Sequence, residues 1–134
     1  MAEDKTLLDL GLENTPDLQA VEAGEYQLKC TSCEVKTSKN TGGQFIMCRF
    51  EIPEIPESKE ITQVMMLPTK EDSDKQQIKR KGAIKRCLEA FDIDISQPFN
   101  PELMVGATGF ANLGVEEDPE YGEQNYVKNF ITGA

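Results

Sequence analysis

Residues 24–52 read GEYQLKCTSCEVKTSKNTGGQFIMCRFEI and contain the clearest structural pattern in the chain. Their second half alternates between apolar and other side chains, and the apolar phase consists of Ile46, Cys48, Phe50 and Ile52. In the first half the alternation changes phase near Thr31 and Ser32, which predicts a strand with a β-bulge. Residues 37–43 between the halves supply Asn and Gly, which tolerate positive φ. The stretch therefore predicts a β-hairpin with one face in the core and one face outside.

The rest of the chain adds one helix and three strands to this hairpin. ITQVMMLP, residues 61–68, predicts a third strand ended by proline, and residues 107–115 and 124–132 predict two more, joined by the acidic turn EEDPEYGE. Between residues 72 and 91 the apolar period becomes helical, with Asp72, Ser73 or Asp74 able to cap the start. The apolar positions of this helix are Ile84, Cys87, Leu88 and Phe91.

This order of elements is that of an OB-fold. We therefore predict a mainly β domain over residues 25–134, a five-stranded OB-like Greek-key barrel with one α-helix between strands 3 and 4. An α+β sheet stacked on one helix would give the same order, and it remains the alternative architecture. Residues 1–24 predict a separate acidic N-terminal arm, because they hold six acids and only Lys5, with irregular leucine spacing interrupted by Pro16.

Composition restricts the partners of the protein. The 134 residues carry 14 Lys and Arg against 24 Asp and Glu, a net charge of −10 that on average repels polyanions. Residues 75–86, KQQIKRKGAIKR, nevertheless hold six of the basic side chains and no acid. Because fields decay over about 8 to 10 Å in physiological salt, this strip can still attract an anion. No stretch predicts a membrane helix or a signal peptide, so we expect a cytoplasmic protein.

Catalysis is disfavoured by the residues themselves. The chain has no histidine, which removes the commonest general base and the commonest metal ligand. The glycines of TGG, residues 41–43, lack the following GK[ST] of a phosphate loop. The acids of DSD, residues 72–74, lie at a helix start, where carboxylates complement the backbone dipole. We expect a protein that is not an enzyme and needs no cofactor.

Four cysteines raise the question of a zinc site: Cys30, Cys33, Cys48 and Cys87. The spacing of CTSC is half of a tetrahedral site. A second C-x-x-C motif is missing, and three of the four cysteines occupy apolar phase positions, which suits small buried side chains. Buried structural thiols are therefore the favoured interpretation, and zinc is the less favoured one.

The faces turned away from the predicted core carry rings and cations. Phe45, Met47 and Arg49 share one side of the second strand, and Tyr126, Lys128 and Phe130 share one side of the fifth. Bases stack on aromatic rings while Lys and Arg hold phosphates, so this pattern predicts a surface for single-stranded nucleic acid. The predicted helix would add four phosphate contacts, Lys79, Arg80, Lys85 and Arg86. The alternative is that the rings belong to a core, above all Phe130, and that the helix cations are merely solvated.

These segments also resemble a family of small phage proteins found beside replication and recombination genes. The resemblance covers residues 24–131 and includes Gly24 and Tyr26 in the opening strand, the turn from Lys36 to Gly43, the FEI of residues 50–52, and Asn125, Val127, Lys128 and Phe130. Such proteins are regarded as single-stranded-DNA-binding OB-fold proteins. The resemblance implies sequence-independent binding of single strands during phage DNA replication, recombination or repair, in the host cell cytoplasm.

Many such proteins end in a flexible acidic tail that recruits partner proteins. This chain departs from them, because the given sequence ends NFITGA. The acidic arm could do an equivalent job by meeting replication or recombination proteins, whereas its leucines equally suit a contact in a homodimer. Two hypotheses result. The first is a single-stranded-DNA-binding protein, and the second is an acidic protein-interaction or virion structural module on the same barrel, without DNA binding.

Overall fold

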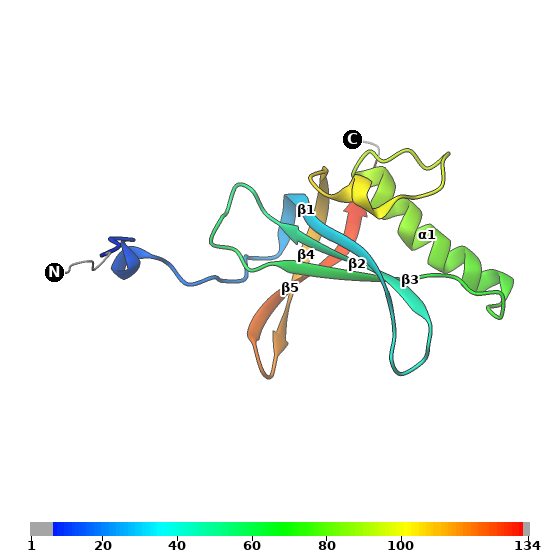
Figure 1. Ribbon diagram of the computed structural model, residues 1–134, viewed down its shortest axis with the longest axis horizontal. Helices are drawn as coiled ribbons and strands as arrows, with labels where there is room; N and C mark the ends of the chain where they lie inside the picture. The colour runs from blue at the N-terminus through cyan, green and yellow to red at the C-terminus, as the bar shows by residue number, and fades with distance from the viewer. Residues whose placement is uncertain (1–6, 133–134) are drawn as a thin grey trace.

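The computed structural model describes residues 7–132 and confirms a mainly β fold with one α-helix between the third and fourth strands. The strands are β1 (Gly24–Thr37), β2 (Gln44–Glu51), β3 (Ile61–Met66), β4 (Thr108–Asp118) and β5 (Gly122–Ile131). The helix is α1 (Asp74–Ala90), and two short 3-10 turns are η1 (Leu12–Asn14) and η2 (Pro101–Met104). All five strands form one antiparallel sheet in the order β3-β2-β1-β4-β5 (Figure 1).

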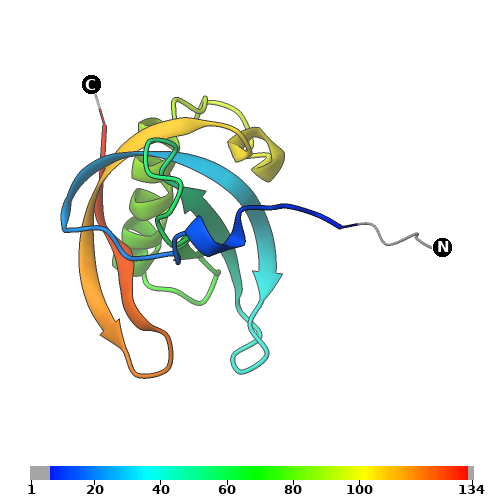
Figure 2. The same ribbon diagram turned by 90° about the vertical axis from the view of Figure 1, so that its left-hand side faces the viewer.

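The sheet curls strongly but stays open. Figure 2 shows the curl, which brings the edge strands β3 and β5 close enough for Cα atoms to lie within 8 Å. No backbone ladder joins these two strands in the described part of the chain, so the closed barrel predicted from the sequence is not confirmed. A side chain helps to hold the edges together, because Lys59 Nζ donates to the carbonyl oxygens of Tyr121 at 3.0 Å and Glu123 at 2.8 Å.

The predicted bulge in β1 is confirmed and explains how the sheet bends. The β1–β2 register shifts between Cys30 and Ser32, and the Thr31 hydroxyl donates to the Arg49 carbonyl oxygen at 3.2 Å. Residues 24–29 of β1 pair with β4, whereas residues 29–37 pair with β2. A bulge increases the local twist, so the long central strand can serve two partners that diverge from each other.

The core lies between the concave side of the sheet and α1. Ser73, one of the three cap candidates in the sequence, is the N-cap of the helix, and its hydroxyl accepts from the Gln76 N–H at 3.1 Å. At the other end Phe91 stacks on Phe50 of β2 with ring centroids 5.1 Å apart. The side chains with under 2 % exposure are Phe50, Leu28, Ile46, Ile52, Ile61, Met104, Leu113, Cys30, Cys48 and Cys87. The core phases predicted for β2 and α1 are therefore confirmed.

The segment before β1 is attached to the rest of the fold at Gln19 and Val21. The Gln19 N–H donates to the Glu57 carbonyl oxygen at 2.8 Å, and Gln19 accepts from the Lys59 N–H at 2.9 Å. Asn125 of β5 then brackets Val21, accepting from its N–H at 2.8 Å and donating to its carbonyl oxygen at 2.9 Å. Residues 7–18 before this attachment are exposed throughout. None of the helices described is long and apolar enough to cross a membrane.

The β4–β5 hairpin is longer than the sequence predicted. Residues 116–123 were expected to form one acidic turn, yet β4 continues to Asp118 and β5 begins at Gly122. The Asp118 carboxylate accepts from the N–H groups of Tyr121 at 2.9 Å and Glu120 at 2.8 Å, which closes a tight turn and lowers the pKa of this exposed carboxyl. Charged side chains can continue the strands of a hairpin when both faces are solvated. A run of acidic residues is therefore not sufficient to locate the turn.

Candidate nucleic-acid interface

An apolar patch covers the outer face of β2 and β3. The β2–β3 register sets Phe45 opposite Met66 and Met47 opposite Val64, and all four side chains point away from the core. Val64 is 47 % exposed and Met66 36 %, while the two β2 side chains are half-buried against them. The predicted outward side of β2 is therefore confirmed. We call these four residues the β2–β3 patch.

Two cations border the β2–β3 patch. Arg49 follows Met47 on the same side of β2, and one of its guanidinium nitrogens lies 3.8 Å from the Met47 sulfur. Lys36 of β1 lies directly opposite Phe45. Their ion pairs are long and exposed, Arg49 to Glu60 and Lys36 to Glu34, each at 3.9 Å. Such surface pairs contribute little to stability, so both cations remain available for an anionic ligand.

Sequence reasoning missed Lys36, Val64 and Met66 as members of this surface. Lys36 alternates with Glu34, in the phase opposite to Cys33 and Val35, so its outward position could have been derived from the pattern. The two β3 residues could not, because the β2–β3 register decides which of their side chains lie beside Phe45.

Tyr126 lies on the outer side of β5 and is 37 % exposed. It is paired with Gly114 of β4, and a Cβ atom on that glycine would meet the tyrosine ring at 2.4 Å. The ring therefore lies directly over the glycine, with part of its surface left in solvent. Its neighbours along β5 reach towards β3 across the seam between these two strands, since the Glu123 carbonyl oxygen accepts from Lys59 and Lys128 lines a hollow with Gln63, whereas the Tyr126 ring covers Gly114 of β4.

Phe130 does not share the face of Tyr126, and the prediction that Tyr126, Lys128 and Phe130 lie on one side of β5 is wrong. The β4–β5 register passes from Asn112 opposite Asn129 to Leu113 opposite Val127, so Lys128 is the extra residue of a β-bulge. Because one extra residue reverses the alternation, the ring turns inward. It packs edge-on against Phe50 at 6.1 Å and Phe91 at 6.0 Å between centroids.

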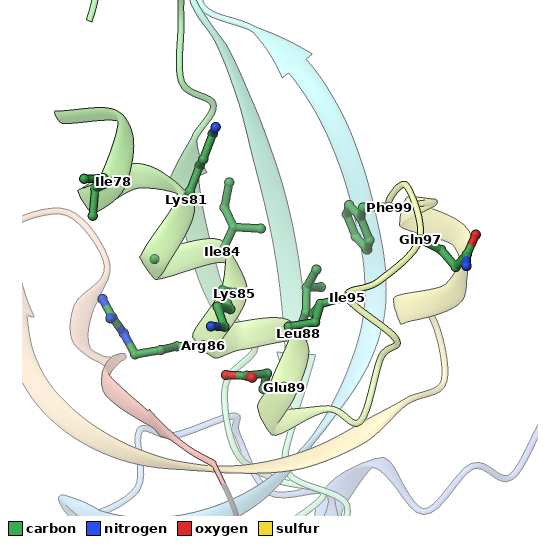
Figure 3. Close-up of a pocket in the computed structure, with 11 residues that line it drawn as sticks. Ile78, Lys81, Ile84, Lys85, Arg86, Leu88, Glu89, Ile95, Gln97 and Phe99 are labelled. Atoms are coloured by element: carbon green, nitrogen blue, oxygen red, sulfur yellow. The ribbon is translucent and has the colours of Figure 1, made fainter. Parts of the chain in front are cut away.

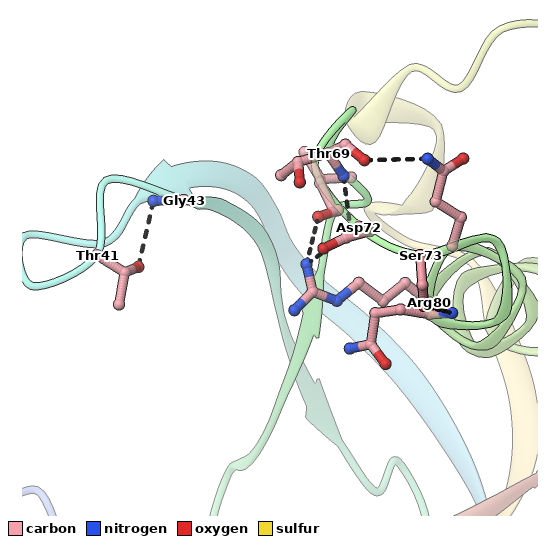
Figure 4. Close-up of polar contacts among 9 residues, drawn as sticks. Thr41, Gly43, Thr69, Asp72, Ser73 and Arg80 are labelled. Atoms are coloured by element: carbon pink, nitrogen blue, oxygen red, sulfur yellow. Dashed lines mark hydrogen bonds and ion pairs between the residues drawn. The ribbon is translucent and has the colours of Figure 1, made fainter.

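Arg80 is engaged within the protein. Its guanidinium donates to the Asp72 carboxylate at 3.0 Å and to the Leu67 carbonyl oxygen at 3.3 Å, and Asp72 also accepts from the Thr69 N–H at 2.9 Å (Figure 4). The two side chains of this ion pair are only 25 % and 14 % exposed. The pair therefore fixes the connection between β3 and α1, which is a structural role for a residue predicted to contact phosphate.

The remaining helix cations lie on two sides of α1. Lys79 lines a hollow of about 300 Å³ together with Val64 and Met66 of the β2–β3 patch. Arg86 lines a second hollow, of about 270 Å³, together with Lys128. Gln63 and Ala83 line both hollows, so the two are neighbours along the β3–β5 seam. One side of the basic helix therefore continues the β2–β3 patch.

Lys85 belongs to the other side of α1. It lines a separate groove of about 660 Å³ between the helix and residues 95–99 (Figure 3). Of the predicted helix cations, the structure thus brings Lys79 and Arg86 towards the patch, holds Arg80 in an ion pair, and places Lys85 apart.

The cysteines are buried in the core, as the favoured interpretation expected. The Cys48 thiol donates toward the Cys33 sulfur at 3.5 Å. Hydrogen bonding with Cys30, Cys33 and Cys87, together with burial, raises the pKa of the Cys48 thiol, so it stays neutral. Within residues 7–132, no group of three or more Cys, His, Asp or Glu side chains is arranged to hold a metal ion.

No protein-family model matches the chain, and no curated protein is significantly similar to it. The side chains of the surface must therefore indicate the function. The β2–β3 patch offers one aromatic ring, two thioethers and a valine for planar apolar groups. Lys36, Arg49, Lys79 and Arg86 offer positive charge beside it or along the β3–β5 seam.

Proposed function

We propose that the protein binds single-stranded DNA, without sequence preference, on the outer face of β2 and β3. The observation that supports this most directly is the β2–β3 patch with Lys36 and Arg49 at its border. A single strand exposes flat apolar bases and regularly spaced phosphates, so it needs stacking surfaces and cations side by side. A duplex hides its bases and would gain only the phosphate contacts.

The proposal includes an OB-like architecture for the curled sheet. OB-folds bind oligonucleotides on the face of strands 2 and 3 and on the loops that follow strands 1 and 4. Here the corresponding loops are residues 38–43 and 119–121, and Figures 1 and 2 show both hairpins projecting to the same side of the molecule. In this proposal β3 and β5 close the barrel through side chains such as Lys59 rather than through a backbone ladder.

The protein would act by binding and not by catalysis. The resemblance to phage proteins of replication and recombination modules supports a role in covering single strands during those processes, in the cytoplasm of an infected host. We propose that the DNA strand contacts Phe45, Met47, Arg49 and Tyr126. The structure adds Lys36, Val64 and Met66 to these candidate contacts. Lys79, Arg86 and Lys128 would extend the phosphate path along the β3–β5 seam.

The proposal is tested by fluorescence anisotropy with labelled oligo-dT of about 30 nucleotides, longer than the roughly 4–16 nucleotides that one OB-fold covers. A duplex of the same length is the control, and each titration is repeated at two salt concentrations. We expect binding that prefers the single strand and weakens as salt rises. Absence of binding at low salt would reject the proposal and favour a protein-interaction or virion structural module, in which the β2–β3 patch meets another protein.

A further inference from the structure

An apolar groove on the far side of α1 shares only Arg86 with the proposed DNA site. It lies between the helix and residues 95–99, and Figure 3 shows Ile84, Leu88, Ile95 and Phe99 around the same space. Ile78 at one end is 71 % exposed, and Ile95 is 44 % exposed. Large aliphatic side chains gathered in an open groove mark an interaction site more often than isolated ones do. We call it the α1 groove.

The rim of the α1 groove is basic. Lys81, Lys85 and Arg86 line it, and Glu89 is the one acidic residue among its lining side chains. In the part of the chain that the structure describes, no ion pair engages either lysine. A binding segment that combines apolar side chains with carboxylates could therefore pack on the isoleucines and pair with the basic side chains at the rim.

The chain itself contains such a segment. Residues 7–18, LLDLGLENTPDL, carry three acids and no basic residue. Their leucines are exposed, at Leu7 89 %, Leu8 70 %, Leu10 63 %, Leu12 71 % and Leu18 61 %. Only Leu18 lines a hollow of its own molecule, beside Ile52 and Ile55. Leu7, Leu8, Leu10 and Leu12 lie within six residues, directly before and at the start of η1, so they form one local apolar cluster along the segment. We call residues 7–18 the leucine segment.

The leucine segment lies far from the α1 groove of its own molecule. Figure 1 shows the segment at one end of the long axis and α1 towards the other, and Figure 2 shows the segment in front with the helix behind. The segment leaves the sheet at Gln19, which is tied to Glu57 and Lys59. Occupation of the groove by the same molecule would require this segment to reverse its direction.

We propose that the leucine segment of one molecule docks into the α1 groove of a second copy. Asp9, Glu13 and Asp17 would face Lys81 and Lys85, while leucines cover the exposed isoleucines. The contact joins two different surfaces, so it can repeat from molecule to molecule or close in a reciprocal pair. If the proposed function holds, repeated contacts would make binding along a long single strand cooperative. The self-association itself does not depend on DNA.

Sedimentation velocity without DNA tests the proposal on the full chain over a concentration series. One variant changes the segment, Leu8→Ser with Leu10→Ser, and another changes the groove, Ile78→Ser with Ile95→Ser. Leu103→Ser is the matched control, because Leu103 is 58 % exposed and does not line the groove. We expect the wild type and the control to associate as concentration rises and each double variant to remain monomeric. Circular dichroism should show unchanged folds, since all the substituted side chains are at least partly exposed.

Mixing the two double variants is the decisive experiment. Each retains one surface that the other lacks, so an equimolar mixture should form a one-to-one dimer although neither variant associates alone. A wild type that stays monomeric at every concentration would overturn the proposal. A mixture that stays monomeric would also overturn it, because the two surfaces would then not contact each other. Association without any binding to oligo-dT would instead reject the proposed function and leave this inference in place.

Discussion

Strands β2 and β5 have similar sequence patterns but present them differently. In β2 the alternation of FIMCRF is unbroken, so Phe45, Met47 and Arg49 stay on the outer side. In β5 the bulge at Lys128 leaves Tyr126 outside and turns Phe130 into the core. The comparison shows that alternation assigns faces only up to the first bulge. Beyond a bulge, the same residue types can have opposite roles.

The largest expected effect is on stability and tests whether Phe130 of β5 faces the core. Phe130→Ala should lower the free energy of unfolding by about 3 kcal/mol, because the ring packs against Phe50 and Phe91. Tyr126→Ala is the matched variant on the outer side and should cost only about 1 kcal/mol. Urea unfolding followed by circular dichroism measures both. Equal costs for the two variants would contradict the opposite orientation of the rings.

A double-mutant cycle tests the outward position of Tyr126. Gly114→Ala should destabilise the fold by about 2 kcal/mol, because the new Cβ atom would overlap the tyrosine ring. In a Tyr126→Ala background most of this cost should disappear, which urea unfolding of the four proteins would reveal. Gly43→Ala is the control, since a Cβ there meets only ordinary contacts. Additive costs would show that the ring does not lie over Gly114.

Removal of the Phe45 ring tests DNA binding on β2, the strand whose alternation has no bulge. Phe45→Ala should weaken oligo-dT binding by about 1–3 kcal/mol, roughly 5- to 150-fold, through loss of one stacked base. Val35→Ala is the control, because Val35 is exposed but belongs to the phase of β1 that pairs with inward-facing Ile46. Anisotropy titrations measure both variants. Unchanged affinity for Phe45→Ala would remove this ring from the binding surface.

The smallest effect concerns single cations. Arg49→Gln on β2 and Lys128→Gln on β5 should each reduce the slope of log K against log salt by roughly 0.7, the value for one phosphate contact on a single strand. Lys85→Gln should leave the slope unchanged, because Lys85 lies on the other side of α1. Anisotropy at several salt concentrations gives the slopes. If only Arg49→Gln reduces the slope, the strand does not extend along the β3–β5 seam.

Much of the fold could be predicted from local pattern. The bulge near Thr31 and the inward face of α1 depend on residues close in sequence, and both were predicted correctly. The helix cap was narrowed to three neighbouring residues, of which Ser73 is the one used. The length of the β4–β5 hairpin was not, because its strands continue through exposed acids that ordinarily mark a turn. The inward orientation of Phe130 was weighed only as an alternative, because the bulge arises from pairing with β4.

The sequence alone therefore determined the order of elements, the core phases of β2 and α1, and the presence of a ring and a cation on the outer side of β2. These follow from periodicity, since a side chain's direction depends on its place in a strand or helix. Only the tertiary structure decided which residues assemble: Val64 and Met66 beside Phe45, Arg80 bound to Asp72, and Lys85 separated from Lys79. The physical reason is that register, bulges and helix orientation depend on contacts between segments distant in sequence, which no local pattern contains.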